Sequence, residues 1–113
     1  MSDYSCPCSE KCVLQNAMDS IGGKWKLPIL CSLTTNGPSR YNDILRSVKG
    51  ISNTMLSKTL KEMEASGLVG RHEYLEVPVR VEYAITEKAQ KLQPIIMEII
   101  KWDLEWQSGR DDG

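Results

Sequence analysis

The chain lacks the features that mark membrane proteins, exported proteins and chains of several domains. No apolar run approaches the roughly 20 residues that a membrane-spanning helix needs. The first five residues have neither the basic start nor the apolar block of a signal peptide. No stretch rich in proline, glycine and serine divides the 113 residues. We therefore expect one cytoplasmic domain, small enough to gain stability from a partner subunit.

Net charge and histidine are also scarce. The formal net charge is −1, which argues against indiscriminate binding to nucleic acid. The charge is uneven, however, because residues 22–61 carry seven lysines and arginines against one acidic residue, Asp43. A basic block in a nearly neutral chain is typical of a localised anion-binding surface. His72 is the only histidine. With no partner histidine we interpret it as a surface residue of a strand, and we predict no metal site.

Apolar residues at helical spacing predict the elements of the first half. After an arm at residues 1–11, a helix is expected at Cys12–Ile21, and a second runs from Lys24–Trp25 to the stop at Asn36-Gly37-Pro38. Ser39–Tyr41 is either a brief edge strand or the lead into a third helix, which ends at Val48.

The next helix has a start signal at Ser52 and a stop signal at Gly67. Its apolar side is Leu56, Leu60 and Met63. Its other side is polar: Asn53, Thr54, Ser57, Lys58 and Lys61. Amphipathic surface helices are common. Here, however, a short helix and a turn precede it, which is the helix-turn-helix spacing.

Beyond Gly67 the period changes to alternation, which predicts strands at Leu68–Tyr74 and Val79–Ile85 joined by a projecting loop. Thr86 is expected to cap the final helix, with Pro94 starting it late or kinking it. This helix is apolar on more than one face, so a second subunit should cover it. The predicted fold is α+β, mainly α. It is a winged helix-turn-helix domain over residues 12–107, with a two- to three-stranded antiparallel wing sheet and a polar tail at 108–113.

Several segments, in order, resemble HxlR-type winged-helix transcriptional regulators, which are related to the MarR group. They are Ile21–Leu30, Gly37–Ile44, Gly50–Leu56, Leu60–Val69, Val77–Tyr83 and Thr86–Lys88. The resemblance covers roughly residues 12–107. It implies a homodimeric bacterial DNA-binding regulator, not an enzyme, without a cofactor. It also implies dimerisation through the first and last helices, a Ser52–Ser66 helix in the major groove, and a wing at Tyr74–Val79. The small-molecule effector, if there is one, stays unknown.

On this interpretation the polar side of the helix binds double-stranded DNA, and a dimer binds an inverted repeat. Asn53 would read adenine, Thr54 a thymine methyl, Ser57 either kind of edge, and Lys58 guanine or phosphate. Ser52 and Lys61 complete this surface. Because no arginine lies on it, readout should also depend on DNA shape and phosphate contacts.

Other basic residues are expected to position the protein on the DNA backbone. Arg40, Lys49 and Lys26 are predicted to hold phosphates. Arg80, near the wing, is predicted to contact phosphate or the minor groove. The competing interpretation of Arg80 is an ion pair with Glu82 or Glu73.

Cys6, Cys8 and Cys12 crowd three thiols into seven residues. Lys11 beside Cys12 at a helix start would favour the reactive thiolate. We weigh inert thiols against a sensor of oxidants or electrophiles and, less favoured, a thiolate metal sensor. Cys31 is expected to be a small core residue.

Two functions compete with DNA-binding regulation. The first is that of a winged-helix module that binds proteins instead of DNA. The second is that of a thiol enzyme, for which the Cys-x-x-Cys and the partnering base are missing.

Overall fold

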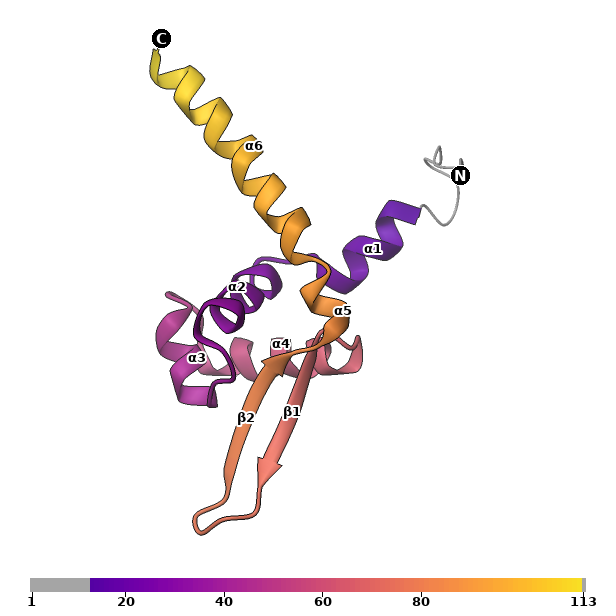
Figure 1. Ribbon diagram of the computed structural model, residues 1–113, viewed down its shortest axis with the longest axis vertical. Helices are drawn as coiled ribbons and strands as arrows, with labels where there is room; N and C mark the ends of the chain where they lie inside the picture. The colour runs from indigo at the N-terminus through magenta and orange to yellow at the C-terminus, as the bar shows by residue number, and fades with distance from the viewer. Residues whose placement is uncertain (1–12, 113) are drawn as a thin grey trace.

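The structure is a computed structural model that describes residues 13–112, with side chains described to residue 107. The predicted arm and Cys6, Cys8 and Cys12 lie outside the described residues. Figure 1 shows a cluster of helices from which a β-hairpin projects on one side and two helices on the other. The elements in order are α1 (Val13–Ile21), α2 (Lys26–Asn36), α3 (Tyr41–Ser47), α4 (Asn53–Ala65), β1 (Val69–Tyr74), β2 (Arg80–Ile85), α5 (Glu87–Gln90) and α6 (Gln93–Asp112). The winged helix-turn-helix fold class is confirmed.

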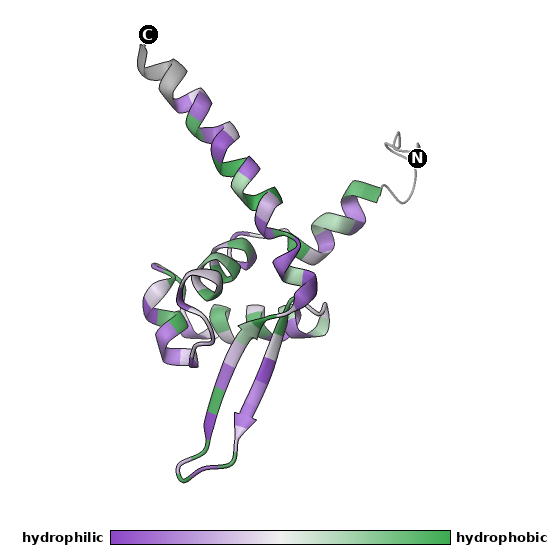
Figure 2. Ribbon diagram, in the orientation of Figure 1, coloured by the Kyte–Doolittle hydropathy of each residue, from purple (hydrophilic) through white to green (hydrophobic). Residues whose placement is uncertain are grey.

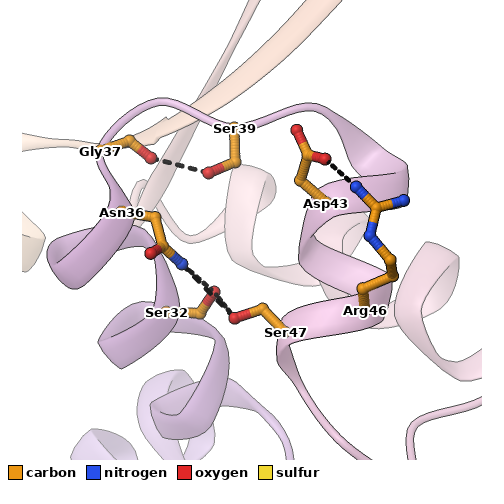
Figure 3. A network of polar contacts seen from close by, with 7 residues as sticks. All are labelled: Ser32, Asn36, Gly37, Ser39, Asp43, Arg46 and Ser47. Atoms are coloured by element: carbon orange, nitrogen blue, oxygen red, sulfur yellow. Dashed lines mark hydrogen bonds and ion pairs between the residues drawn. The ribbon is translucent and has the colours of Figure 1, made fainter.

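The core lies between α2, α3, α4 and the base of the hairpin. Its fully buried side chains are those placed inward by helical spacing, joined by the first residue after the α4 stop. They are Ile29, Leu30, Leu33, Ile44, Leu56, Leu60, Met63 and Leu68. A small polar cluster joins α2 to α3: Ser32 donates to Ser47 across 2.9 Å, and Asn36 reaches both hydroxyls (Figure 3). Helices α2 and α3 are thus fixed to each other by apolar and polar contacts.

Both ends of α4 are fixed by local chemistry, as predicted. The Ser52 hydroxyl accepts a hydrogen bond from the Met55 backbone N–H across 3.0 Å. At the other end Gly67 adopts φ 81°, a left-handed conformation that favours glycine. Lys88 then donates to the Ser66 carbonyl across 2.7 Å, and Thr86 donates to the Gly67 carbonyl across 2.6 Å. These contacts tie the α4 C-terminus to the segment after the hairpin.

The hairpin is antiparallel, with Val69 opposite Ile85 and Tyr74 opposite Arg80. Ser39 adds a single bridge to Tyr83, through backbone hydrogen bonds of 2.9 and 2.8 Å. The structure therefore combines the two conformations expected for Ser39–Tyr41: Ser39 forms a single bridge, and α3 follows at Tyr41. Within the described residues the sheet consists of two strands, β1 and β2.

The C-terminal helix differs from the prediction in one respect. Thr86 caps the four-residue helix α5, where its hydroxyl accepts from the Ala89 N–H, and does not cap the final helix. The long helix begins only at Gln93, which places Pro94 in its first turn. Proline has no N–H and its ring would clash with the carbonyl four residues earlier, so a continuous helix across this point is disfavoured. Of the late start and the kink expected from Pro94, the late start is observed.

Helices α1 and α6 extend away from the core on the side opposite the hairpin tip (Figure 1). Helix α1 buries no residue, and Ile96 is the one buried apolar side chain of α6 among those described. Figure 2 shows apolar residues along both projecting helices. Those 41–67% exposed are Val13, Leu14, Met18, Ile95, Met97, Ile99, Ile100, Trp102, Leu104 and Trp106. Within residues 13–112 no helix is both long and apolar enough to cross a membrane.

Candidate nucleic-acid interface

The polar side of α4 forms an open depression on the surface. Asn53, Thr54, Ser57, Lys58 and Lys61 line it together with Tyr41 of α3. All five of these α4 side chains are exposed. Because Leu56, Leu60 and Met63 are buried on the other side of the helix, the core fixes which side faces outward. The structure thus gathers the predicted reading residues on one rigid surface.

Lys58 is shared by this depression and a neighbouring hollow. It lines the depression described above and also a second hollow, formed with the turn between α1 and α2 and with Met55 and Glu62 of α4. Ser52, at the start of α4, is exposed as well. Met55 is more than a third exposed and does not belong to the buried side of the helix.

Tyr41 is a member of this surface that sequence reasoning missed. Its ring packs against the core. Its hydroxyl, however, lies 2.6 Å from Oδ1 and 2.8 Å from the backbone carbonyl oxygen of Asn53. The available signal was the residue type, because a tyrosine at an inward position needs a partner for its hydroxyl.

The predicted phosphate-binding residues are not equally available. Arg40 and Lys49 are exposed, and neither takes part in an ion pair in the described part of the chain. Lys26 behaves differently: its side chain is 13% exposed, and its amine donates to the Asp19 carbonyl across 3.2 Å. The same amine lies 3.9 Å from a carboxylate oxygen of Glu62. The charge of Lys26 is therefore partly compensated within the fold.

Arg80 is held inside the wing. Its guanidinium lies 2.9 Å from Glu76 and 2.8 Å from Glu82, and stacks 3.8 Å from the ring centre of Tyr74. Hydrogen bonding to Glu76, above all, raises the pKa of Arg80 beyond its ordinary value. The structure thus shows an ion-paired Arg80, the competing interpretation of the sequence, with Glu76 in place of Glu73.

The hairpin register explains this choice of partner. Tyr74 lies opposite Arg80 and His72 opposite Glu82, so these four residues share one face of the hairpin. Glu73 points to the other face. His72 is exposed and packs edge-on against Tyr74, with ring centres 4.6 Å apart. No cluster of three metal-ligating side chains occurs among residues 13–107.

Cys31 is a free thiol on α2 and is partly exposed. It lines a surface hollow beside Ser32, Asn36 and Ser47, and it is absent from the buried core. The prediction of a core cysteine is therefore wrong. The buried residues of α2 are Ile29, Leu30, Ser32 and Leu33. With 3.6 residues per turn, position 31 falls on the opposite side of the helix from that stripe.

Comparison with known proteins finds a clear set of relatives. An HTH-type transcriptional regulator of Methanothermobacter thermautotrophicus is 44% identical over 91 residues, which cover 80% of this chain and 69% of the relative. The solved HTH-type regulator YtcD superposes with a TM-score of 0.81 at 33% identity, covering 85% of this chain and 97% of the other.

Two further solved structures are of regulators in their reduced forms. The reduced form of the redox regulator HypR matches with a TM-score of 0.78 at 33% identity, covering 88% of this chain and 98% of HypR. The reduced form of the transcriptional regulator YodB from B. subtilis matches with a TM-score of 0.72 at 35% identity, covering 79% of this chain and 86% of YodB. The model of the HxlR-like helix-turn-helix family matches residues 20–111. The chain belongs to this family of transcriptional regulators.

Proposed function

We propose that the protein regulates transcription in the cytoplasm as a homodimer that inserts α4 of each subunit into successive major grooves of an inverted-repeat operator. The observation that carries the proposal is the outward side of α4, where short polar side chains and lysines form one exposed surface on a helix capped at both ends. A helix N-terminal half with exposed donors suits base edges in the major groove.

The charges around α4 support the same assignment. Four basic residues form no ion pairs in the described structure: Lys58 and Lys61 on α4, Lys49 in the turn before α4, and Arg40 just before α3. We assign these four to phosphate contacts, which position the protein without reading sequence. Lys26 and Arg80, each compensated by glutamate, are assigned to the fold.

The projecting helices support the dimer. The 20-residue helix α6 is about 30 Å long, and most of its apolar side chains, including Trp102 and Trp106, remain more than 40% exposed. Contiguous apolar surface of this kind marks an interaction site. A second copy that covers α1 and α6 would bury both helices and set two α4 helices roughly one DNA turn apart, about 34 Å.

The test is a selection of bound duplexes from fragments of the source genome, followed by affinity measurements at several salt concentrations. Wild type should enrich inverted repeats and bind them with a salt-dependent affinity. The variant with Asn53, Thr54 and Lys58 all changed to alanine should lose that preference. Alanines at Thr35, Gln90 and Lys91, which are exposed outside α4, are the matched control. A folded protein with no salt-dependent DNA affinity would instead favour the protein-binding module.

A thiol response is a second candidate, favoured by the likeness to the redox regulator HypR and to YodB, which was solved in reduced and diamide-treated forms. We propose that peroxide oxidises the Cys12 thiolate, whose sulfur attacks one peroxide oxygen to give a sulfenic acid and hydroxide, with the second oxygen leaving as water after protonation. Peroxide should then add one oxygen to the mass and change operator affinity. Cys12→Ser should abolish both effects, whereas Cys31→Ser should keep them. Operator affinity that is unchanged after complete modification of Cys12 would exclude the sensor.

A further inference from the structure

We propose that Tyr41 fixes the side-chain amide of Asn53 so that Asn53 presents its nitrogen, a hydrogen-bond donor, to the DNA base. The inference rests on the proposed DNA binding by α4. It makes Tyr41 a positioning residue that determines which bases Asn53 accepts.

Core packing fixes the position of the Tyr41 side chain. The Tyr41 ring packs against the core, so its hydroxyl has a defined position at the start of α4. That hydroxyl is 2.6 Å from Asn53 Oδ1 and 2.8 Å from the Asn53 carbonyl oxygen. Both neighbours are acceptors, and the phenol supplies the one proton that they share.

The fixed oxygen determines where the nitrogen points. The oxygen and nitrogen of an amide lie on opposite sides of the same planar group, so an oxygen directed at Tyr41 turns the nitrogen away from it. The Asn53 nitrogen donates no hydrogen bond within the described residues. Asn53 also lines the open depression together with Tyr41. Its two N–H groups are thus available at the surface.

The consequence concerns base choice. In the major groove, adenine N7, guanine N7 and O6, and thymine O4 accept hydrogen bonds, whereas cytosine offers its amino donor. A freely rotating asparagine amide can show oxygen or nitrogen and so suits either kind of edge. An amide held by Tyr41 shows a donor, and cytosine is then rejected at the contacted base.

The substitution Tyr41→Phe tests this, because it keeps the ring and removes the hydroxyl. The contacted base is identified first, as the position where Asn53→Ala flattens the preference of duplexes selected from a randomised pool. Wild type should disfavour cytosine there about tenfold or more. Tyr41→Phe should reduce that factor to about threefold or less. Tyr74→Phe, which removes a hydroxyl from the wing, is the matched control.

A merely structural role for Tyr41 would lower stability and leave the base preference intact, which would overturn the inference. So would an Asn53→Ala variant that flattens no position. If wild type binds no duplex at all, the proposed function fails with it, a result distinct from retained discrimination in Tyr41→Phe. NMR relaxation of the Asn53 side-chain amide in wild type gives an independent reading. An order parameter near 0.85 is expected, and one below about 0.6 would contradict a fixed amide.

Discussion

Substitutions of Ser52 can distinguish the stability of α4 from its proposed contact with DNA. Its hydroxyl accepts from the Met55 N–H across 3.0 Å, while its carbonyl accepts from the Leu56 N–H across 2.9 Å. In Ser52→Ala the second bond remains and the first is lost. An N-cap of this type contributes about 1 kcal/mol, within a range of roughly 0.5–2. Because the site is exposed, water can partly satisfy the Met55 N–H, so we expect a loss of about 0.5–1 kcal/mol.

The assay is thermal unfolding at one fixed protein concentration, since dimerisation makes the Tm concentration-dependent. For a domain of this size the loss should lower the Tm by about 2–6 °C. Ser52→Asp should show no such loss, because its carboxylate can accept from the same N–H and complements the positive end of the helix dipole. The same charge should repel phosphate, so operator affinity should fall at least tenfold while the Tm is kept.

Two results would refute this reasoning. A Tm for Ser52→Asp as low as that of Ser52→Ala would show that the cap is not the stabilising contact. Wild-type operator affinity in Ser52→Asp would show that the start of α4 does not face DNA.

The remaining predictions concern the dimer, the phosphate contacts and the wing. Ile99→Glu should be monomeric by sedimentation at concentrations where wild type is a dimer, since it places a charge in the proposed interface. The control Leu75→Glu makes the same kind of change, apolar to acidic, at the wing tip and should stay dimeric. A dimeric Ile99→Glu would exclude this interface. Lys49→Ala should reduce the slope of log affinity against log salt by about 0.9 without changing which sequences are preferred, and an unchanged slope would remove Lys49 from the phosphate contacts. Arg80→Gln should lower the Tm, because it removes both ion pairs and the stacking on Tyr74, but keep the salt slope; a slope reduced by about one would return Arg80 to the DNA surface.

The helix that carries the proposed interface was predictable because its signals are local. Ser52 and Gly67 act within one turn of their own positions, and the apolar spacing of Leu56, Leu60 and Met63 fixes the buried side. The break before Gln93 was only half predictable. Pro94 disfavours an uninterrupted helix, but the sequence does not show the contacts across the fold that hold α5, such as the Lys88 hydrogen bond to the α4 C-terminus.

Partners across the fold account for the rest of the differences. The sequence shows the charge of Lys26 but not that Glu62 comes within 3.9 Å of it, since the two residues belong to different helices. For Arg80 the sequence named Glu82 correctly, because strand alternation puts residues 80 and 82 on one face. It named Glu73 in place of Glu76, because Glu73 is placed on the other face only by the hairpin register. The Tyr41 hydroxyl likewise meets Asn53 only through the packing of α3 against the start of α4.

Methylation protection of guanine N7 on a selected operator tests the central claim most directly, because this atom lies in the major groove. With wild type, the account predicts two protected patches on one side of the duplex, about one helical turn (~34 Å) apart. Both should disappear in the Asn53/Thr54/Lys58 alanine variant at concentrations where the Thr35/Gln90/Lys91 variant still protects. Patches that persist in a folded Asn53/Thr54/Lys58 variant would contradict the assignment of α4 as the helix that reads DNA.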